Sequence, residues 1–149
     1  KGGSFMRVIL QRVQNAQCAV KVKITGKIDQ GLLVFVGFGK AETQEKLMKM
    51  AAKIAQARVF EDELGKMNLN VMQIQGKILS ISQFTLYGDT TKGHRPSYDQ
   101  AAQSDDAKAY YEAFNHYLSS YCGVETGQFQ AHMDILALQD GPVTLSYEN

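Results

Sequence analysis

The sequence predicts a single mixed α/β domain, of the α+β kind, in which several strands and two main helices enclose a hydrophobic core. Apolar residues recur at every second position in several short segments, which is typical of strands with one exposed face. Two other segments carry apolar residues at helical spacing. The chain has 149 residues and contains no repeat, linker or low-complexity tract, so we expect one domain.

Three strands are predicted near the start of the chain. Arg7–Val13 is a mostly apolar run, and Cys18–Thr25 alternates between apolar and polar residues, so each predicts a strand. Gly26 is expected to permit a turn after the second strand. Gly31–Phe38 is apolar at almost every position, which predicts a central strand covered on both faces.

A helix and two further strands are predicted in the middle of the chain. Apolar residues recur at helical spacing between Thr43 and Ala57, and Thr43 is a suitable amino-terminal cap. Arg58–Phe60 predicts a brief strand, followed by a polar turn in which Gly65 is expected to adopt a positive φ angle. Ile78–Leu86 predicts another strand.

A polar loop and the second helix are predicted next. Tyr87–Tyr98 is polar and contains two glycines and a proline, which favours a loop. Ser104 is expected to cap a helix with two aspartates in its first turn, where they complement the helix dipole. Gly123 is expected to end this helix.

The last part of the chain predicts two strands with a turn between them. Gln128–Ala137 alternates between polar and apolar residues, Gly141–Pro142 is expected to turn the chain, and Val143–Tyr147 completes the sheet. At the other end, residues 1–5 have the composition of a cloning remnant, so we expect the functional domain to span residues 6–149.

Composition limits the possible functions. The net charge is only +1, so any contact with a nucleic acid needs a local cluster of basic residues. Cys18 and Cys122 lack metal-binding spacing and are expected to be buried free thiols. No apolar run has the length of a membrane span and no signal peptide is apparent, so we expect a cytoplasmic protein without membrane contact.

The segment Ser82-Gln83-Phe84-Thr85-Leu86 suggests a serine or threonine nucleophile near the end of a strand. Such a nucleophile needs a base within hydrogen-bonding reach and a group that orients the base. The chain contains three histidines, which are scattered: His94, His116 and His132. The GxSxG motif, a metal-binding spacing and a phosphate-binding glycine loop are all missing, so we expect neither a metal nor a cofactor.

Two other segments could carry function. Lys92-Gly93-His94-Arg95 groups positive side chains in the polar loop, which is either a solvated loop or a contact for phosphate or ribose. Gly141–Pro142 between two strands is usually a tight turn. A cis bond there would instead project the two carbonyl groups in nearly the same direction.

Several segments form an ordered set of motifs: Met6–Val13, Gly31–Val34, Arg58–Asp62, Gly65–Asn68, Ser82–Asp89, Lys92–Gly93, Arg95–Ser97, Val124–Gly127 with Phe129, and Asp140–Thr144. In their order and spacing, from Met6 to Tyr147, the chain resembles the D-aminoacyl-tRNA deacylase family. In this family an Asn is usual where Gln139 stands here.

The resemblance implies a homodimer of barrel-like subunits whose active sites lie at the subunit interface. Gly141 and Pro142, joined by a cis bond and oriented by Arg12, are expected to reach into the partner's pocket. The implied pocket for the terminal adenosine and the aminoacyl group is lined by these residues: Ser82, Gln83, Phe84 and Thr85, with Phe129 and Met133 as its apolar wall. Lys92 and Arg95 are expected to contact the tRNA.

The resemblance also implies hydrolysis of D-aminoacyl-tRNA, a chiral proofreading step, and of glycine mischarged on tRNA-Ala. Because no base is apparent, we expect the ribose 2′-OH to assist, with backbone N–H groups near Phe84 and Thr85 stabilising the oxyanion. The carbonyl groups of Gly141 and Pro142 would exclude L side chains. Two alternatives stay open: a threonine-dependent hydrolase of small esters, and a non-catalytic module that binds RNA 3′ ends.

Overall fold

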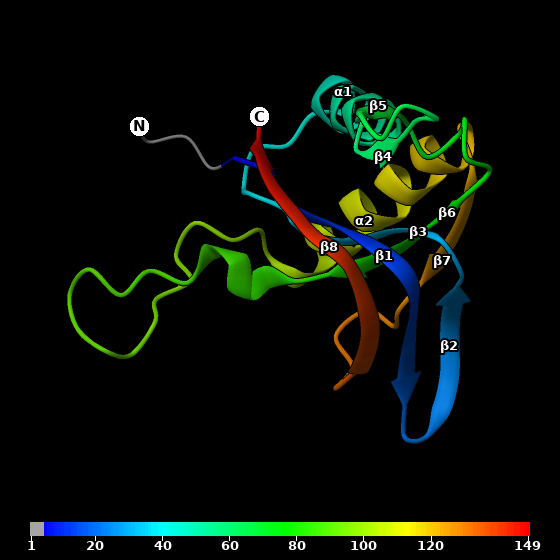
Figure 1. The fold of residues 1–149 in the computed structure, drawn as a ribbon. Helices are drawn as coiled ribbons and strands as arrows, with labels where there is room; N and C mark the ends of the chain where they lie inside the picture. Colours follow the sequence, from blue (N-terminus) through cyan, green and yellow to red (C-terminus); the bar gives the residue numbers. More distant parts are fainter. Residues whose placement is uncertain (1–4) are drawn as a thin grey trace.

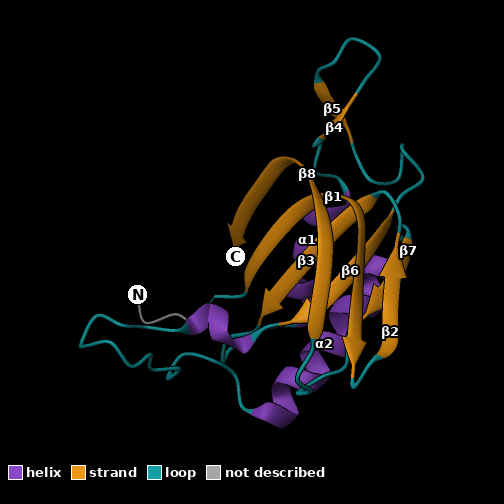
Figure 2. Ribbon diagram, turned by 60° about the horizontal axis from the view of Figure 1, so that its bottom comes forward, coloured by secondary structure: helices purple, strands orange, loops and turns teal. Residues whose placement is uncertain are grey.

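The computed structural model describes residues 5–149, so residues 1–4 of the expected cloning remnant lie outside the described part. Two helices cover one face of a strongly curved mixed sheet (Figures 1 and 2), which confirms the predicted fold class. The elements are β1 Arg7–Val20, β2 Lys23–Ile28, β3 Gly31–Gly37, α1 Gln44–Ala55, β4 Phe60–Glu61, β5 Met67–Leu69, β6 Lys77–Ser82, the 3₁₀ turn η1 Phe84–Tyr87, α2 Ser104–Ser119, β7 Gly123–Thr126 and β8 Asp134–Glu148.

The long strand β1 organises the sheet. Its residues 7–13 pair with β3 and its residues 16–20 pair with β2, while β8 runs antiparallel along its other edge. On the far side of β3, strands β6 and β7 continue the sheet in parallel. Strand β2 returns to β7, where the Lys27 amide lies 3.5 Å from Glu125 Oε1. The sheet is therefore a nearly closed barrel, as the resemblance implies.

The prediction of one strand over Cys18–Thr25 is wrong, because the chain reverses in the middle of this segment. Lys21 and Val22 have φ angles of 49° and 62°, which form a two-residue hairpin turn between β1 and β2. A two-residue turn inserted into an alternating pattern leaves the alternation visible in the sequence. Gly26 lies inside β2, not in a turn. A glycine is required there because a Cβ atom would approach the Thr126 carbonyl oxygen to 2.6 Å.

The strand predicted over Ile78–Leu86 continues only to Ser82. The Gln83 amide then donates to the Val36 carbonyl oxygen at 2.8 Å, and the chain turns into η1. The last few residues of a short apolar alternation fit a single 3₁₀ turn as well as an extended strand. This difference matters because the turn carries most of the Ser82–Leu86 motif.

The strand predicted over Gln128–Ala137 begins only at Asp134, and no turn separates it from the last strand. Strand β8 instead runs through Gly141–Pro142, whose peptide bond is cis as the resemblance implies. Residues 140–143 of β8 bulge opposite the single residue Arg12 of β1, because the register shifts at this point. A bulge lets one strand absorb extra residues without ending the pairing, so the sequence signals of a turn can occur within a strand.

The two predicted helices are present, with corrections at both ends of the second. Helix α2 ends at Ser119, and Gly123, which was expected to end it, is the first residue of β7. In α1, Thr43 Oγ1 accepts a hydrogen bond from the Lys46 amide at 3.2 Å, which confirms the predicted cap. In α2, the capping position belongs to Gln103, whose side chain makes no capping hydrogen bond, and Ser104 is the first helical residue. The Ser104 hydroxyl instead accepts a hydrogen bond from the side-chain amide of Gln130.

Three short strands complete the fold. Strands β4 and β5 form a hairpin, and Gly65 between them has a φ of 78°, as predicted. Strand β7 follows α2 directly and was not predicted, since its four residues are too few to show an alternating pattern. No helix among residues 5–149 is long and apolar enough to cross a bilayer.

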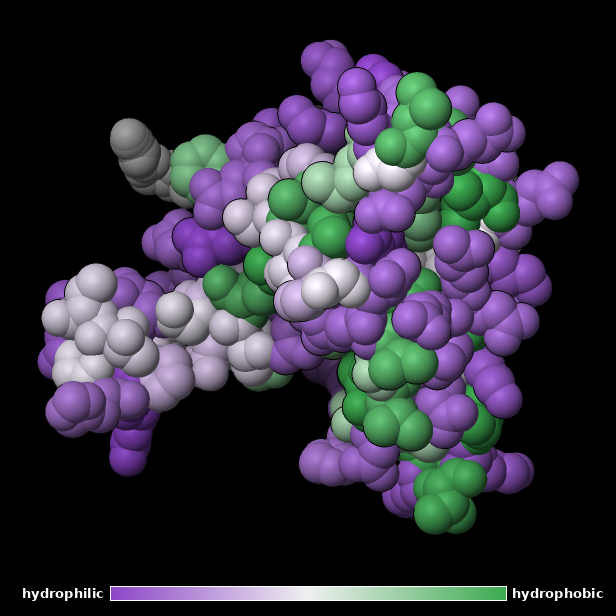
Figure 3. Space-filling model, in the orientation of Figure 1, coloured by the Kyte–Doolittle hydropathy of each residue, from purple (hydrophilic) through white to green (hydrophobic). Residues whose placement is uncertain are grey.

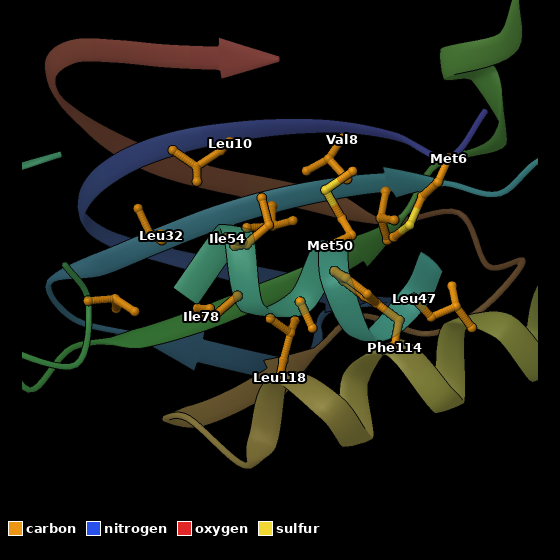
Figure 4. Packing of buried hydrophobic residues seen from close by; sticks show 14 of the residues in the cluster. Met6, Val8, Leu10, Leu32, Leu47, Met50, Ile54, Ile78, Phe114 and Leu118 are labelled. Atoms are coloured by element: carbon orange, nitrogen blue, oxygen red, sulfur yellow. The ribbon is translucent and has the colours of Figure 1, made fainter. Parts of the chain in front are cut away.

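Buried side chains form two clusters, one on each face of the central strands. Cys18 is fully buried and Cys122 half-buried, and both are free thiols. Residues of the larger cluster, between the sheet and the helices, include Met6, Val8, Leu10, Leu32, Leu47, Met50, Ile54, Ile78, Phe114 and Leu118 (Figure 4). The second cluster fills the barrel with Val13, Ala16, Cys18, Ile28, Leu33, Leu79 and Ile81. Strands β3 and β6 are thus packed on both faces, so they form a rigid support for the segments that follow their carboxyl ends.

Candidate functional site

A cleft of about 790 Å³ opens at the carboxyl ends of the parallel strands β3 and β6. Ligands of open α/β sheets commonly bind beyond the carboxyl ends of the strands. One wall consists of residues 37–38 and 82–84, which directly follow or end these two strands. The other walls come from residues 98–107, which include the first turn of α2, and from residues 129–135, which include the start of β8.

The cleft brings together five of the predicted site residues. Ser82, Gln83 and Phe84 line it from the end of β6, and Phe129 and Met133 line it from the segment before β8. Tyr111 of α2 holds this arrangement from behind, because its hydroxyl donates to the Ser80 carbonyl oxygen at 2.6 Å. The Tyr111 ring also lies 6.1 Å from that of Phe129, between ring centroids. The groups therefore share one supported surface, although more than forty residues separate the two segments.

Thr85, which was expected to line the pocket, follows the lining residue Phe84 and is exposed, but it does not itself line the cleft. The Thr85 hydroxyl accepts a hydrogen bond from the Gln83 side-chain amide. Burial raises the pKa of Tyr87 and of Tyr111, so both phenols stay protonated near neutral pH. In the part of the chain that the structure describes, no histidine or carboxylate is hydrogen-bonded to Ser82 or Thr85. Among residues 5–149, neither hydroxyl therefore has the hydrogen-bonded base that a serine or threonine nucleophile requires.

His132 lines the cleft, but its geometry does not suit a catalytic triad. The ring is almost fully solvent-exposed, and its Nε2 atom lies 3.7 Å from Asp134 Oδ1. His94 and His116 are exposed elsewhere, in the polar loop and on α2. Residues 5–149 contain no group of three His, Cys, Asp or Glu side chains that could hold a metal ion.

The turn η1 offers backbone donors at the cleft. The first N–H groups of any helical turn lack acceptors within the turn. Among the described residues, the N–H groups of Phe84 and Thr85 have no backbone acceptor, whereas the neighbouring Gln83 amide is bonded to the Val36 carbonyl. Two adjacent free donors on a fixed backbone are suited to binding a developing negative charge.

Sequence reasoning missed Tyr98, which forms part of the cleft beside Phe84. The two rings meet edge to face, with 4.9 Å between their centroids and 67° between their planes. Phe84 is 58% exposed despite its size, so this aromatic pair is open to a ligand. The polar loop returns Tyr98 to this place because Asp89 and Ser97 exchange backbone hydrogen bonds of 2.8 and 2.9 Å. The sequence signal that could have identified Tyr98 is its position directly after the motif Arg95-Pro96-Ser97.

Lys92 and Arg95 do not line the cleft. Both are exposed on the loop between η1 and α2, which projects from the body of the molecule (Figure 1). Their proposed contact with tRNA stays a prediction.

Gly141 and Pro142 form a second feature, outside the cleft of their own chain. Arg12 is 6% exposed and donates through Nε to the Asp140 carbonyl oxygen at 3.1 Å and through Nη1 to the Val59 carbonyl oxygen at 2.7 Å. Its Nε atom also lies 3.3 Å from Asp140 Oδ2. The bulge that carries Gly141 and Pro142 is thereby tied to the core, while both residues are themselves exposed.

The strand that carries this bulge has an apolar, exposed surface. On β8, Leu136, Leu138 and Leu145 are 68%, 51% and 39% exposed. Figure 3 shows hydrophobic side chains among polar ones on the face that bears β8 and the β1–β2 hairpin. In the described chain β8 pairs only with β1, so its other edge is open. Gln139, in the position where an Asn was expected, is exposed and lies opposite Val13 of β1.

Comparison with known proteins gives consistent matches over almost the whole chain. Residues 9–148 match the model of the family described as D-Tyr-tRNA(Tyr) deacylase. A D-aminoacyl-tRNA deacylase of Thermosipho africanus is 50% identical over 141 residues, which cover 94% of this chain and 95% of that protein. A D-aminoacyl-tRNA deacylase of Exiguobacterium sibiricum is 51% identical over 144 residues, covering 96% and 99%.

Two solved structures share the fold. One, described as c-Myc DNA Unwinding Element Binding Protein, has a TM-score of 0.90 at 35% identity and covers 96% of this chain and 98% of its own. The other, described as a probable eukaryotic D-amino acid tRNA deacylase, has a TM-score of 0.87 at 18% identity, covering 97% and 100%, which is a likeness in fold.

Proposed function

The chain belongs to the D-Tyr-tRNA(Tyr) deacylase family and is a hydrolase of aminoacyl-tRNA esters; from this premise we propose that it carries out chiral proofreading in the cytoplasm. It would cleave the ester of D-aminoacyl-tRNA into free amino acid and tRNA. The observation that carries the proposal is the convergence of two distant motif segments on one cleft, with Ser82–Phe84 facing Phe129 and Met133.

The cleft suits the 3′ end of an aminoacylated tRNA. Its volume of about 790 Å³ has room for a nucleoside and an amino acid. Exposed Phe84 beside Tyr98 offers an aromatic surface, and stacking of a base on such a surface contributes about 1–3 kcal/mol. Lys92 and Arg95 on the projecting loop would contact phosphates of the tRNA, which adds affinity without sequence preference.

Catalysis would depend on positioning and backbone donors. The N–H groups of Phe84 and Thr85 would stabilise the oxyanion that forms when water attacks the ester carbonyl, an effect of about 3–4 kcal/mol. The ribose 2′-OH of the substrate, adjacent to the ester, would orient or polarise the water. Aminoacyl esters are already activated, so positioning alone gives a large acceleration. Ser82, Gln83 and Thr85 would then hold the substrate without acting as nucleophiles.

We expect Thr85→Ala and Thr85→Val to lower kcat on D-tyrosyl-tRNA by less than about tenfold, since the hydroxyl has no base to activate it. The Val variant keeps the shape of the threonine, so it separates loss of the hydroxyl from loss of packing. Single-turnover deacylation of radiolabelled D-tyrosyl-tRNA measures the effect. A loss of several orders of magnitude in both variants would restore Thr85 as the nucleophile.

Chiral selection would come from a second copy of the chain. Gly141 and Pro142 lie outside the cleft of their own chain, are exposed, and are tied to the core through Arg12. They are flanked on β8 by exposed leucines and by an open strand edge, features of a surface that another protein covers. In the proposed homodimer their carbonyl groups enter the partner's cleft and occupy the space that an L side chain needs. Glycine has no side chain to exclude, so glycine mischarged on tRNA-Ala would also be hydrolysed.

Deacylation of D-tyrosyl-, L-tyrosyl- and glycyl-tRNA, compared at equal concentrations, tests the proposed function. We expect rapid hydrolysis of the D and glycyl esters and hydrolysis of the L ester near its spontaneous rate. Equal activity on a small D-tyrosine ester would favour a threonine-dependent esterase. Binding of D-tyrosyl-tRNA without hydrolysis would favour an RNA 3′-end binding module, and either outcome would contradict the proposal.

A further inference from the structure

Arg7, at the start of β1, contacts the turn that carries the proposed oxyanion donors. Its Nη1 atom donates a hydrogen bond of 2.9 Å to the Leu86 carbonyl oxygen, at the carboxyl end of η1. We propose that Arg7 is a positioning residue of the deacylation reaction, which holds η1 in place through this bond. This inference rests on the proposed role of the Phe84 and Thr85 N–H groups.

A turn as short as η1 needs support from outside. It has only four residues, and a single 3₁₀ turn has too few internal hydrogen bonds to be stable alone. At its start, the Gln83 amide is bonded to the Val36 carbonyl oxygen of β3 at 2.8 Å. At its end, Arg7 provides the hydrogen bond to the Leu86 carbonyl. The two bonds connect the turn to β3 and β1, the packed centre of the sheet.

The guanidinium group of Arg7 is itself held from two further sides. Its Cζ atom lies 4.7 Å from the centroid of the Tyr87 ring, a cation–π distance. Its Nε atom lies 3.5 Å from Glu148 Oε2, at the end of β8. Tyr87 is 3% exposed and fits closely against β3, because a Cβ atom on Gly37 would approach its ring to 3.0 Å. The Tyr87 ring, which belongs to η1, is therefore fixed between the sheet and Arg7.

Loss of the Arg7 side chain would act on catalysis more than on substrate binding. The bond to Leu86 and the stacking on Tyr87 orient the turn, whereas the walls at Phe129 and Met133 belong to other segments. A shift of about 1 Å in a positioned group can lower a rate about 10²-fold. We therefore expect kcat to fall about 10- to 100-fold in Arg7→Ala. KM should rise by a smaller factor, because the same turn also carries the Phe84 ring.

Rescue by small cations distinguishes positioning from a general loss of structure. Arg7 is partly exposed, so added guanidinium or methylguanidinium can reach the space that Arg7→Ala leaves. We expect these ions to restore part of the lost kcat at concentrations that do not change the circular dichroism of the protein. Arg58→Ala is the matched control, because Arg58 also donates to a backbone carbonyl, that of Asn68 at 3.1 Å, but lies outside the cleft. We expect unchanged kcat and no response to guanidinium in this control.

Arg7→Lys provides a second variant if Arg7→Ala does not fold. Its ammonium group can still donate to the Leu86 carbonyl but does not match the guanidinium plane on Tyr87, so we expect a smaller loss of kcat. Unchanged kcat in both variants would overturn the inference. A folded Arg7→Ala protein whose lost kcat is not restored by guanidinium would also overturn it. If the parent protein does not hydrolyse D-tyrosyl-tRNA, the proposed function itself is wrong.

Discussion

A D-tyrosyl-tRNA that ends in 2′-deoxyadenosine is expected to be hydrolysed by this protein about 10²-fold more slowly than the natural ester. The reason is the composition of the cleft. Ser82 and Thr85 have no hydrogen-bonded base among the described residues, and burial raises the pKa of Tyr87 and Tyr111, so neither phenol can accept a proton near neutral pH. The substrate's own 2′-OH is adjacent to the 3′ ester, and in the proposed mechanism it orients the attacking water.

The measurement compares single-turnover rates on matched tRNAs that carry D-tyrosine on the 3′-OH. Because the 2′-OH also affects spontaneous hydrolysis, each rate is divided by the rate without protein. Binding of both tRNAs is measured separately, with catalytically silent amide analogues, so that a loss of affinity is not mistaken for a loss of catalysis. Equal rate enhancements on the two substrates would show that a protein group activates the water and would contradict the RNA-assisted mechanism.

Gly141→Ala is expected to lower kcat/KM on D-tyrosyl-tRNA and the preference for the D ester by at least about tenfold each. Gly141 has a φ of 123°, a conformation that residues with a side chain rarely adopt. A Cβ atom at this position would also lie 3.1 Å from Arg12 Nη2. The added methyl group would therefore displace Gly141 from Arg12 and shift the carbonyl groups that we propose enter the partner's cleft.

Gly65→Ala is the matched control for this change. Gly65 also has a positive φ, of 78°, but a Cβ atom there has no neighbour within 4 Å. It shares the backbone cost of the substitution without any contact to Arg12 or to the cleft. We expect Gly65→Ala to leave the ratio of D to L hydrolysis unchanged. If Gly141→Ala hydrolysed the D ester at the parent rate and kept the parent ratio of D to L hydrolysis, Gly141 would have no part in chiral selection.

The sequence predicted several elements correctly where their signals are local. The central strand Gly31–Phe38, the cap at Thr43 and the positive φ of Gly65 are all confirmed. The failures have a common cause. At Lys21–Val22 the backbone reverses in a hairpin turn, although the alternation of residues continues through it. Opposite Arg12 the backbone bulges, although the sequence there shows the signals of a turn.

The candidate site was predicted in part. The segment Ser82–Thr85 was selected from its sequence, and Phe129 and Met133 from the family resemblance. Tyr98 was missed, because its approach to Phe84 depends on the backbone bonds between Asp89 and Ser97 that fold the loop back. The open donors of Phe84 and Thr85 were expected near the motif, but the 3₁₀ turn that leaves them unpaired was not.

The sequence by itself determined the family, the single mixed domain and the residue types available for chemistry, because motif order, periodicity and composition are properties of the chain alone. The tertiary structure decided that Ser82 and Phe129 share a cleft and that Gly141 and Pro142 lie outside it. It also decided which segments the two arginines of β1 contact. Arg7 donates a hydrogen bond to the turn η1, and Arg12 donates one to the bulge of β8. These arrangements depend on contacts between segments 47 to 128 residues apart, such as Arg12 with Val59 and with Asp140, and no local pattern encodes them.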